Sequence, residues 1–216
     1  MNTYSHEVSD LEFDNSPNPT KNELAVMSQA LGMLLSVGVP TLECISVVME
    51  ITPNARLRKI LNNAYYGIRH GDYIASSFSG YPRILGIKFI SIVNDGEKMG
   101  CLVDALLEYA HYSGFKPGQL SRQIGWSECL TTFTKNMFES LKDDNSVLKS
   151  LSLSWKGTTA EFQETIKCVR NNVECGCTLS EAMDEAHFCD RFYYNMIQAG
   201  DRNHDLLTSF ELLAKS

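Results

Sequence analysis

The sequence predicts an all-α protein made of two tandem antiparallel helical bundles of about six helices each. Apolar residues recur at helical spacing along the chain, and no segment keeps the alternation with period two that marks a strand. The stretch GEKMGCLVDALLEYA at residues 96–110 also reappears in altered form as GDRNHDLLTSFELLA at residues 200–214. Such self-similarity indicates a tandem repeat.

The repeat divides the chain into four parts. A shift of 104 residues pairs Phe89 with Tyr193 and Glu97 with Asp201, and a shift of 105 aligns the segments further upstream. The stretch GFKPGQLSRQIG contains three glycines and a proline, which is typical of a linker. We expect a disordered acidic tail at 1–23, a first helical domain at 24–113, the linker at 114–126 and a divergent second helical domain at 127–216.

Helix start and stop signals predict the order of the helices in the first domain. An apolar stripe at 24–35 ends at Gly38, and Pro40 opens a second helix through residue 49. Thr52 and Pro53 are expected to start a third stripe at 57–68, which Gly71 ends. A short helix follows, capped by Asp72 and running to 78; then one apolar helix runs from 82 to 94, and a last helix begins after Gly100.

Composition narrows the classes of partner and compartment. The net charge of the chain is −7 and no basic face emerges, so we expect no nucleic acid partner. The longest apolar run, at 24–39, is broken by polar residues and is too short to span a bilayer. The first 23 residues do not resemble a secretory or mitochondrial leader. Seven cysteines without an export signal indicate reduced thiols and a cytoplasmic protein.

One cluster of cysteine and histidine residues could bind a metal. Cys175, Cys177, His187 and Cys189 lie within fifteen residues of one another, and all four are competent zinc ligands. Their spacing matches no common zinc pattern. The favoured interpretation is therefore free thiols, with no metal and no cofactor.

No catalytic motif is present, so the sequence does not predict an enzyme. A nucleophile elbow, a phosphate-binding loop and a zinc protease motif are all absent, and the five histidines are scattered. Gly96 and Gly100 are expected to allow a break between two helices. Glu97 is then expected to cap the helix that begins near Gly100. The alternative is a carboxylate that binds a partner or a cation, with Asp95 close by.

The first domain resembles the cytoplasmic domain of the type II secretion F family, the inner-membrane platform proteins of type II secretion systems and type IV pili. The resemblance rests on a Gly-Val-Pro turn, a helix that ends in glycine and a Gly-Glu-x-x-Gly-x-Leu segment. These place the family motif and the candidate interaction residues at Gly38, Pro40, Gly71, Gly96, Glu97, Gly100 and Leu102. In the second domain Asp143, Asp144 and Asn145 replace the Gly-Val-Pro turn, and His204 replaces the second glycine.

The resemblance implies a non-enzymatic scaffold or adaptor. Members of the family also carry membrane helices, and the sequence departs from them because we expect none here. Its implied partners are the assembly ATPase or other platform components, and a homo-oligomer is compatible with it. The implied location is the cytoplasm, with peripheral attachment to the inner membrane through partners. The alternative function is a small cytosolic protein that binds a metal or senses a ligand through the cluster at 175–189.

Overall fold

The computed structural model describes residues 16–216, and the part of the expected tail at residues 1–15 lies outside the described residues. The described chain forms fourteen helices and no strand, so the all-α prediction is confirmed. Two compact units are present. Unit 1 comprises the described residues up to Ser36 together with Pro40–Lys116, and unit 2 comprises Val37–Val39 with Pro117–Ser216.

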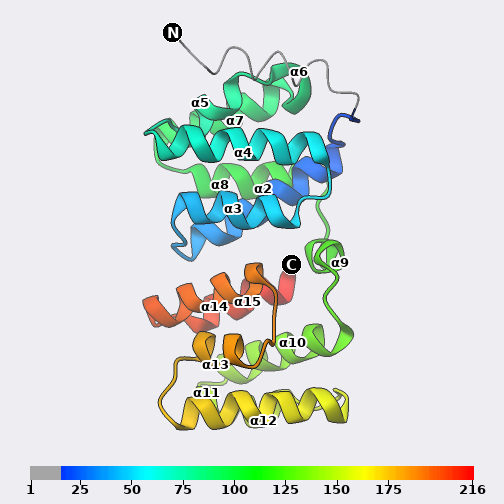
Figure 1. Ribbon diagram of the computed structural model, residues 1–216, viewed down its shortest axis with the longest axis vertical. Coiled ribbons are helices and arrows are strands. Elements are labelled where there is room, and N and C mark those ends of the chain that lie inside the picture. The colour runs from blue at the N-terminus through cyan, green and yellow to red at the C-terminus, as the bar shows by residue number, and fades with distance from the viewer. Residues whose placement is uncertain (1–15) are drawn as a thin grey trace. The chain divides into compact units, whose positions relative to one another are not determined.

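Unit 1 contains seven helices (Figure 1). They are α2 (Lys21–Ser36), α3 (Thr41–Ile51), α4 (Ala55–Arg69), α5 (Ile74–Ser79), α6 (Pro82–Leu85), α7 (Ile87–Met99) and α8 (Leu102–Tyr112). Helix α8 packs against both α2 and α7, while α5 packs against α4 and α7. Unit 1 is thus a bundle in which each neighbour in sequence is also close in space.

The core of unit 1 is apolar and closely packed. Leu34, Ile45 and Ile60 are fully buried on three successive helices. Phe89 of α7 stacks edge to face on Tyr109 at 5.0 Å between ring centroids and lies 5.8 Å from Phe78. These aromatic contacts fix α7 between α5 and α8.

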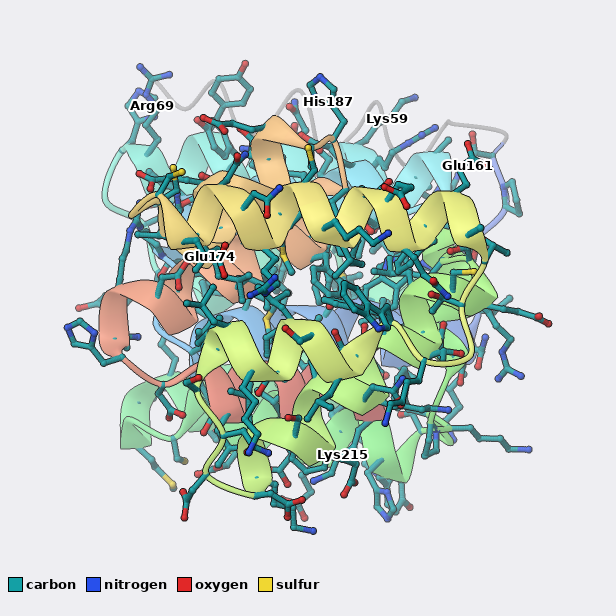
Figure 2. The ribbon with its side chains drawn as sticks, turned by 90° about the horizontal axis from the view of Figure 1, so that it is seen from below. Lys59, Arg69, Glu161, Glu174, His187 and Lys215 are labelled. Atoms are coloured by element: carbon teal, nitrogen blue, oxygen red, sulfur yellow. The ribbon has the colours of Figure 1, made fainter. Side chains whose placement is uncertain are left out.

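The helices of unit 2 are α9 (Gln119–Ile124), α10 (Glu128–Lys142), α11 (Val147–Ser154), α12 (Ala160–Glu174), α13 (Leu179–Glu185), α14 (Arg191–Asn203) and α15 (Leu206–Lys215). From α10 onwards, unit 2 repeats the order of helices in unit 1 but without a counterpart of α6, and α9 is an additional helix at its start. Helices α4 and α12 have the same length, as do α7 and α14. Glu161 and Glu174 mark the first and last turns of α12 in Figure 2.

Aromatic rings make more contacts with one another in unit 2 than in unit 1. Phe133 of α10 packs edge to face on Phe188 at 5.0 Å and lies 6.4 Å from Phe210. Tyr193, the counterpart of Phe89, is fully buried, and its hydroxyl shares a hydrogen bond of 3.0 Å with Thr134. Burial raises the pKa of the Tyr193 phenol.

The observed helix boundaries correct three expectations. Helix α4 begins later than expected, because the side chain of Asn54, and not Thr52, accepts the N–H of Leu57. The single helix expected at 82–94 is divided in two by Gly86, whose φ of +84° ends α6. The expected linker at 114–126 contains the short helix α9.

Ordered structure also begins before residue 24. Helix α2 starts at Lys21, and Thr20 caps it by exchanging hydrogen bonds with Glu23. The carbonyl of Pro17 accepts a hydrogen bond from Asn54. The described part of the expected tail is therefore attached to the start of α4.

The turn at Asp143, Asp144 and Asn145 follows the end of a helix. Asp143 follows the last residue of α10, and Asp144 has a φ of 56°. Asn145 donates to the carbonyl of Ser140 at 3.0 Å. The next helix, α11, is capped by Ser146.

Candidate functional site

The segment that resembles the family motif lies at the junction of α7 and α8. Gly96 lies inside α7, so the expectation that it breaks the helix is wrong. A Cβ atom added at Gly96 would lie 2.6 Å from the Cβ of Ala105 and 3.2 Å from the Cα of Leu102. Glycine is therefore required because the two helices touch at this point.

Unit 2 keeps the same close approach. A Cβ atom at Gly200 of α14 would lie 2.6 Å from the hydroxyl oxygen of Ser209 on α15. The small residues Ala105 and Ser209 occupy equivalent positions in the two units. The pair of a glycine and a small residue thus sets the distance between the last two helices of each unit.

Gly100 provides the break between the two helices. Its φ of 72° is left-handed, and the N–H of Cys101 donates to the carbonyl of Gly96 at 2.8 Å. This bond, with that from Gly100 to the carbonyl of Glu97, forms the Schellman pattern of a helix end. In unit 2 His204 adopts the same conformation with a φ of 56°, although it carries a side chain.

The strain at His204 gives a first prediction. We expect His204→Gly to stabilise unit 2 by about 1 kcal/mol, because a side chain in the left-handed region costs about that much. Gly100→Ala should destabilise unit 1 by a similar amount. Urea denaturation of both variants measures the two effects, and a destabilised His204→Gly would show that the imidazole makes a contact that outweighs the strain.

Glu97 caps a helix, but not the helix that was expected. Its Oε1 accepts the N–H of Ile74 and its Oε2 accepts the N–H of Ala75, both at 2.9 Å. These two N–H groups belong to the first turn of α5, whose N-cap residue Tyr73 makes no side-chain capping hydrogen bond. The expected cap of the helix after Gly100 is therefore wrong, since the carboxylate reaches from α7 to the start of α5.

Asp201 makes the equivalent contact in unit 2. Its Oδ2 accepts the N–H of Ser180 at 2.7 Å, and Ser180 is the counterpart of Ala75 in the repeat. Helix α13 also has a capping box of its own, in which Thr178 and Glu181 exchange hydrogen bonds. Because the two hydrogen bonds of this capping box hold the start of α13, helix α13 depends less on Asp201 than α5 depends on Glu97.

The other candidate residues end or start helices. Gly38 has a φ of 84° in the turn after α2, and Pro40 is the residue before the first turn of α3. Gly71 has a φ of 98° just after α4, and the chain then enters the turn whose N–H groups Glu97 accepts. Leu102 is the half-buried first residue of α8. Gly71 lies three residues before Ile74, whose N–H Glu97 accepts. Pro40 precedes α3 in unit 1, whereas Gly38 belongs to the segment Val37–Val39 of unit 2.

The structure does not gather the cysteine and histidine cluster into a candidate metal site. Within residues 16–216, no three side chains of His, Cys, Asp or Glu gather closely enough to hold an ion. His187 is exposed and extends away from the ribbon at the end of α13 (Figure 2). Burial raises the pKa of the Cys189 thiol, with Asp190 and Asp184 adding to the effect. The pKa of Cys177 is also raised, which disfavours the thiolate form that binds metals.

No helix in the described part of the chain is both long and apolar enough to cross a bilayer. The fold and the α7–α8 junction together define a class of all-α protein. In this class, close contacts at glycine and carboxylates that cap a neighbouring helix hold short helices together. Residues 27–114 match the family described as type II secretion system (T2SS), protein F. The resemblance seen in the sequence is therefore confirmed for this part of the chain, which is similar to that family.

Three relatives align with less than half of the chain. It is 31% identical over 91 residues to type II secretion system protein F of Vibrio cholerae, and 29% identical over 92 residues to the protein of that name from Aeromonas hydrophila. It is 23% identical over 90 residues to the type IV pilus assembly protein PilC of Pseudomonas aeruginosa. These alignments cover 42 to 43% of this chain and 22 to 24% of the relatives. The chain thus spans about a quarter of their length.

Proposed function

We propose that this chain is a non-enzymatic scaffold or adaptor of a bacterial type II secretion or type IV pilus assembly machine. The observation that carries the proposal is the family match over residues 27–114. The geometry of the motif supports it, because Gly96, Glu97 and Gly100 hold helices in place. The chain acts through its helical surfaces, and its partners are the assembly ATPase or other components of the platform.

The residues of the family motif hold the helices of unit 1 in place and do not themselves contact a partner. Glu97 uses both carboxylate oxygens within unit 1, and a residue at Gly96 has no room for a side chain. Partners therefore contact residues around this junction. Self-association through the same helices, giving a homo-oligomer in the cytoplasm or beneath the inner membrane, is compatible with this role.

An association experiment tests the proposed function. The full chain is mixed with the purified assembly ATPase and with the cytoplasmic platform domains of its own organism, and complexes are measured by analytical ultracentrifugation. We expect a complex of defined stoichiometry with at least one of them. Absence of a complex with every component tested would contradict the proposal.

The alternative of a metal-binding protein gives a separate prediction. We expect protein purified without a histidine tag to contain far less than one zinc ion per chain, because the raised thiol pKa values of Cys177 and Cys189 disfavour the thiolate. Elemental analysis before and after dialysis against a chelator measures the content. One tightly held zinc ion per chain, lost together with helical signal on chelation, would favour the alternative.

A further inference from the structure

A groove runs between α7 and α8 on the surface of unit 1. It encloses about 450 Å³. Its apolar lining includes Ile92, Met99 and Tyr112, and the last two side chains are 79% and 67% exposed. Large apolar side chains that gather in one exposed hollow mark a surface that another molecule covers.

The rim of the groove is acidic. Asp95 lines it from α7, and Asp104 and Glu108 line it from α8. The lining contains one cation, Lys88, whose ammonium nitrogen lies 3.9 Å from the centre of the Tyr112 ring, and Lys21 of α2 lies 5.8 Å from the same ring. Because this contact holds Lys88 at one end, the rest of the groove presents negative charge to an occupant.

The second unit shows that the fold does not require these acids. With the shift of 104 residues, the counterparts of Asp95, Met99, Asp104 and Glu108 are Ala199, Asn203, Thr208 and Leu212. Helices α14 and α15 pack through the same glycine contact without the three carboxylates. The acidic rim is therefore a property of unit 1 that packing does not explain.

Unit 2 also shows what kind of element covers this face. The hydroxyl of Ser121 in α9 donates to the carbonyl of Ser216, and Trp126 lies 6.5 Å from the ring of Phe192. Phe192 and Ser216 are the counterparts of Lys88 and Tyr112, and both are buried. Within unit 2, a short helix with its following tryptophan thus covers the corner that is exposed in unit 1.

We propose that the α7–α8 groove of unit 1 binds a short amphipathic helix of a protein partner, with an apolar face flanked by lysine or arginine. The apolar lining receives the apolar face, and Asp95, Asp104 and Glu108 pair with the flanking cations. The inference deepens the proposed function and rests on it, because it assigns the surface through which the scaffold holds a partner.

A designed peptide tests the groove directly. The probe is a fluorescent amphipathic helix of leucine and lysine, about four turns long, and its comparison is a leucine and glutamate peptide with the same apolar face. Anisotropy titration of the full chain should show binding of the lysine peptide that weakens with salt, and about tenfold weaker binding of the glutamate peptide. Equal binding of the two peptides would overturn the proposal.

A matched pair of variants separates the groove from general charge attraction. Asp104→Asn combined with Glu108→Gln should weaken the lysine peptide by about tenfold. Glu139→Gln combined with Glu161→Gln removes the same charge from exposed positions of unit 2 and should change binding by less than about twofold. Unchanged melting temperatures verify folding. A similar loss in both double variants would overturn the assignment to the groove.

The association experiment distinguishes failure of this surface from failure of the proposed function. If the groove variant binds the assembly component as tightly as the unchanged chain does, the groove assignment fails and the scaffold function stands. If the chain binds the lysine peptide through the groove but no component of the machine, the groove stands as a helix-binding surface and the proposed function fails. Loss of both peptide and component in the groove variant alone supports the two together.

Discussion

Gly96→Ala is expected to destabilise unit 1 by about 1 to 3 kcal/mol, the usual cost of extra atoms in a packed interior. The added methyl would lie 2.6 Å from the Cβ of Ala105 and 3.4 Å from the carbonyl oxygen of Cys101. Since Gly96 lies inside α7, alanine would otherwise favour the helix by about 1 kcal/mol. The sign of the change therefore decides between packing and helix propensity.

A second substitution identifies the contact. Ala105→Gly removes the atom that the new methyl meets, so the double variant should recover part of the loss, and a double-mutant cycle measures the coupling. Gly100→Ala is the matched control, because nothing lies within 4 Å of its added Cβ and its cost comes from a φ of +72°. Ala105→Gly should not rescue it.

Unit 2 offers an internal reference for these measurements, because both tryptophans of the chain, Trp126 and Trp155, lie in it and report on unit 2 alone. Amide hydrogen exchange at α7 and α8 reports on unit 1 directly. A Gly96→Ala variant that protects those amides better than the unchanged chain would contradict the close contact between α7 and α8.

Local signals in the sequence identified the helix ends that depend on backbone conformation. Gly38 and Gly71 have positive φ and follow the helices that they were predicted to end, and Gly100, also with positive φ, precedes the last helix of unit 1 as predicted. The apolar stripe at 57–68 lies within α4, with Leu57, Ile60, Leu61 and Ala64 in the core and Ile68 half-buried. Such signals act within a few residues, so a pattern in the sequence is sufficient to detect them.

Contacts between helices distant in sequence were missed. Glu97 caps α5 from 22 and 23 residues away, and no local pattern links the two segments. The contact between Gly96 and Ala105 joins two different helices, so the sequence pattern alone predicted a helix break at Gly96. The repeat contained a usable signal, because an acid recurs at 97 and 201 while Tyr73 provides no cap for the helix that follows it.

Glu97→Gln is expected to destabilise unit 1 by about 1.5 to 3 kcal/mol, the usual contribution of hydrogen bonds to a charged group. The amide keeps one acceptor oxygen, but its NH₂ group must face the N–H of Ile74 or Ala75, which is a donor opposite a donor. The loss of negative charge at the positive end of α5 adds to the cost. Helix α5 is six residues long and packs on α7, so this damage should be concentrated in that pair.

Asp201→Asn is the matched variant in unit 2, and it should cost less than Glu97→Gln. Asp201 accepts one N–H where Glu97 accepts two, and the capping box of Thr178 and Glu181 holds α13 independently. Urea denaturation gives the two free energies of unfolding, and hydrogen exchange at Ile74 and Ala75 should accelerate in the Glu97 variant. If Glu97→Gln instead keeps the stability of the unchanged chain and loses binding to an assembly component more than about tenfold, the carboxylate contacts the partner directly. In that event the hydrogen bonds to α5 would be exchanged for intermolecular ones, and the junction itself would be the binding surface.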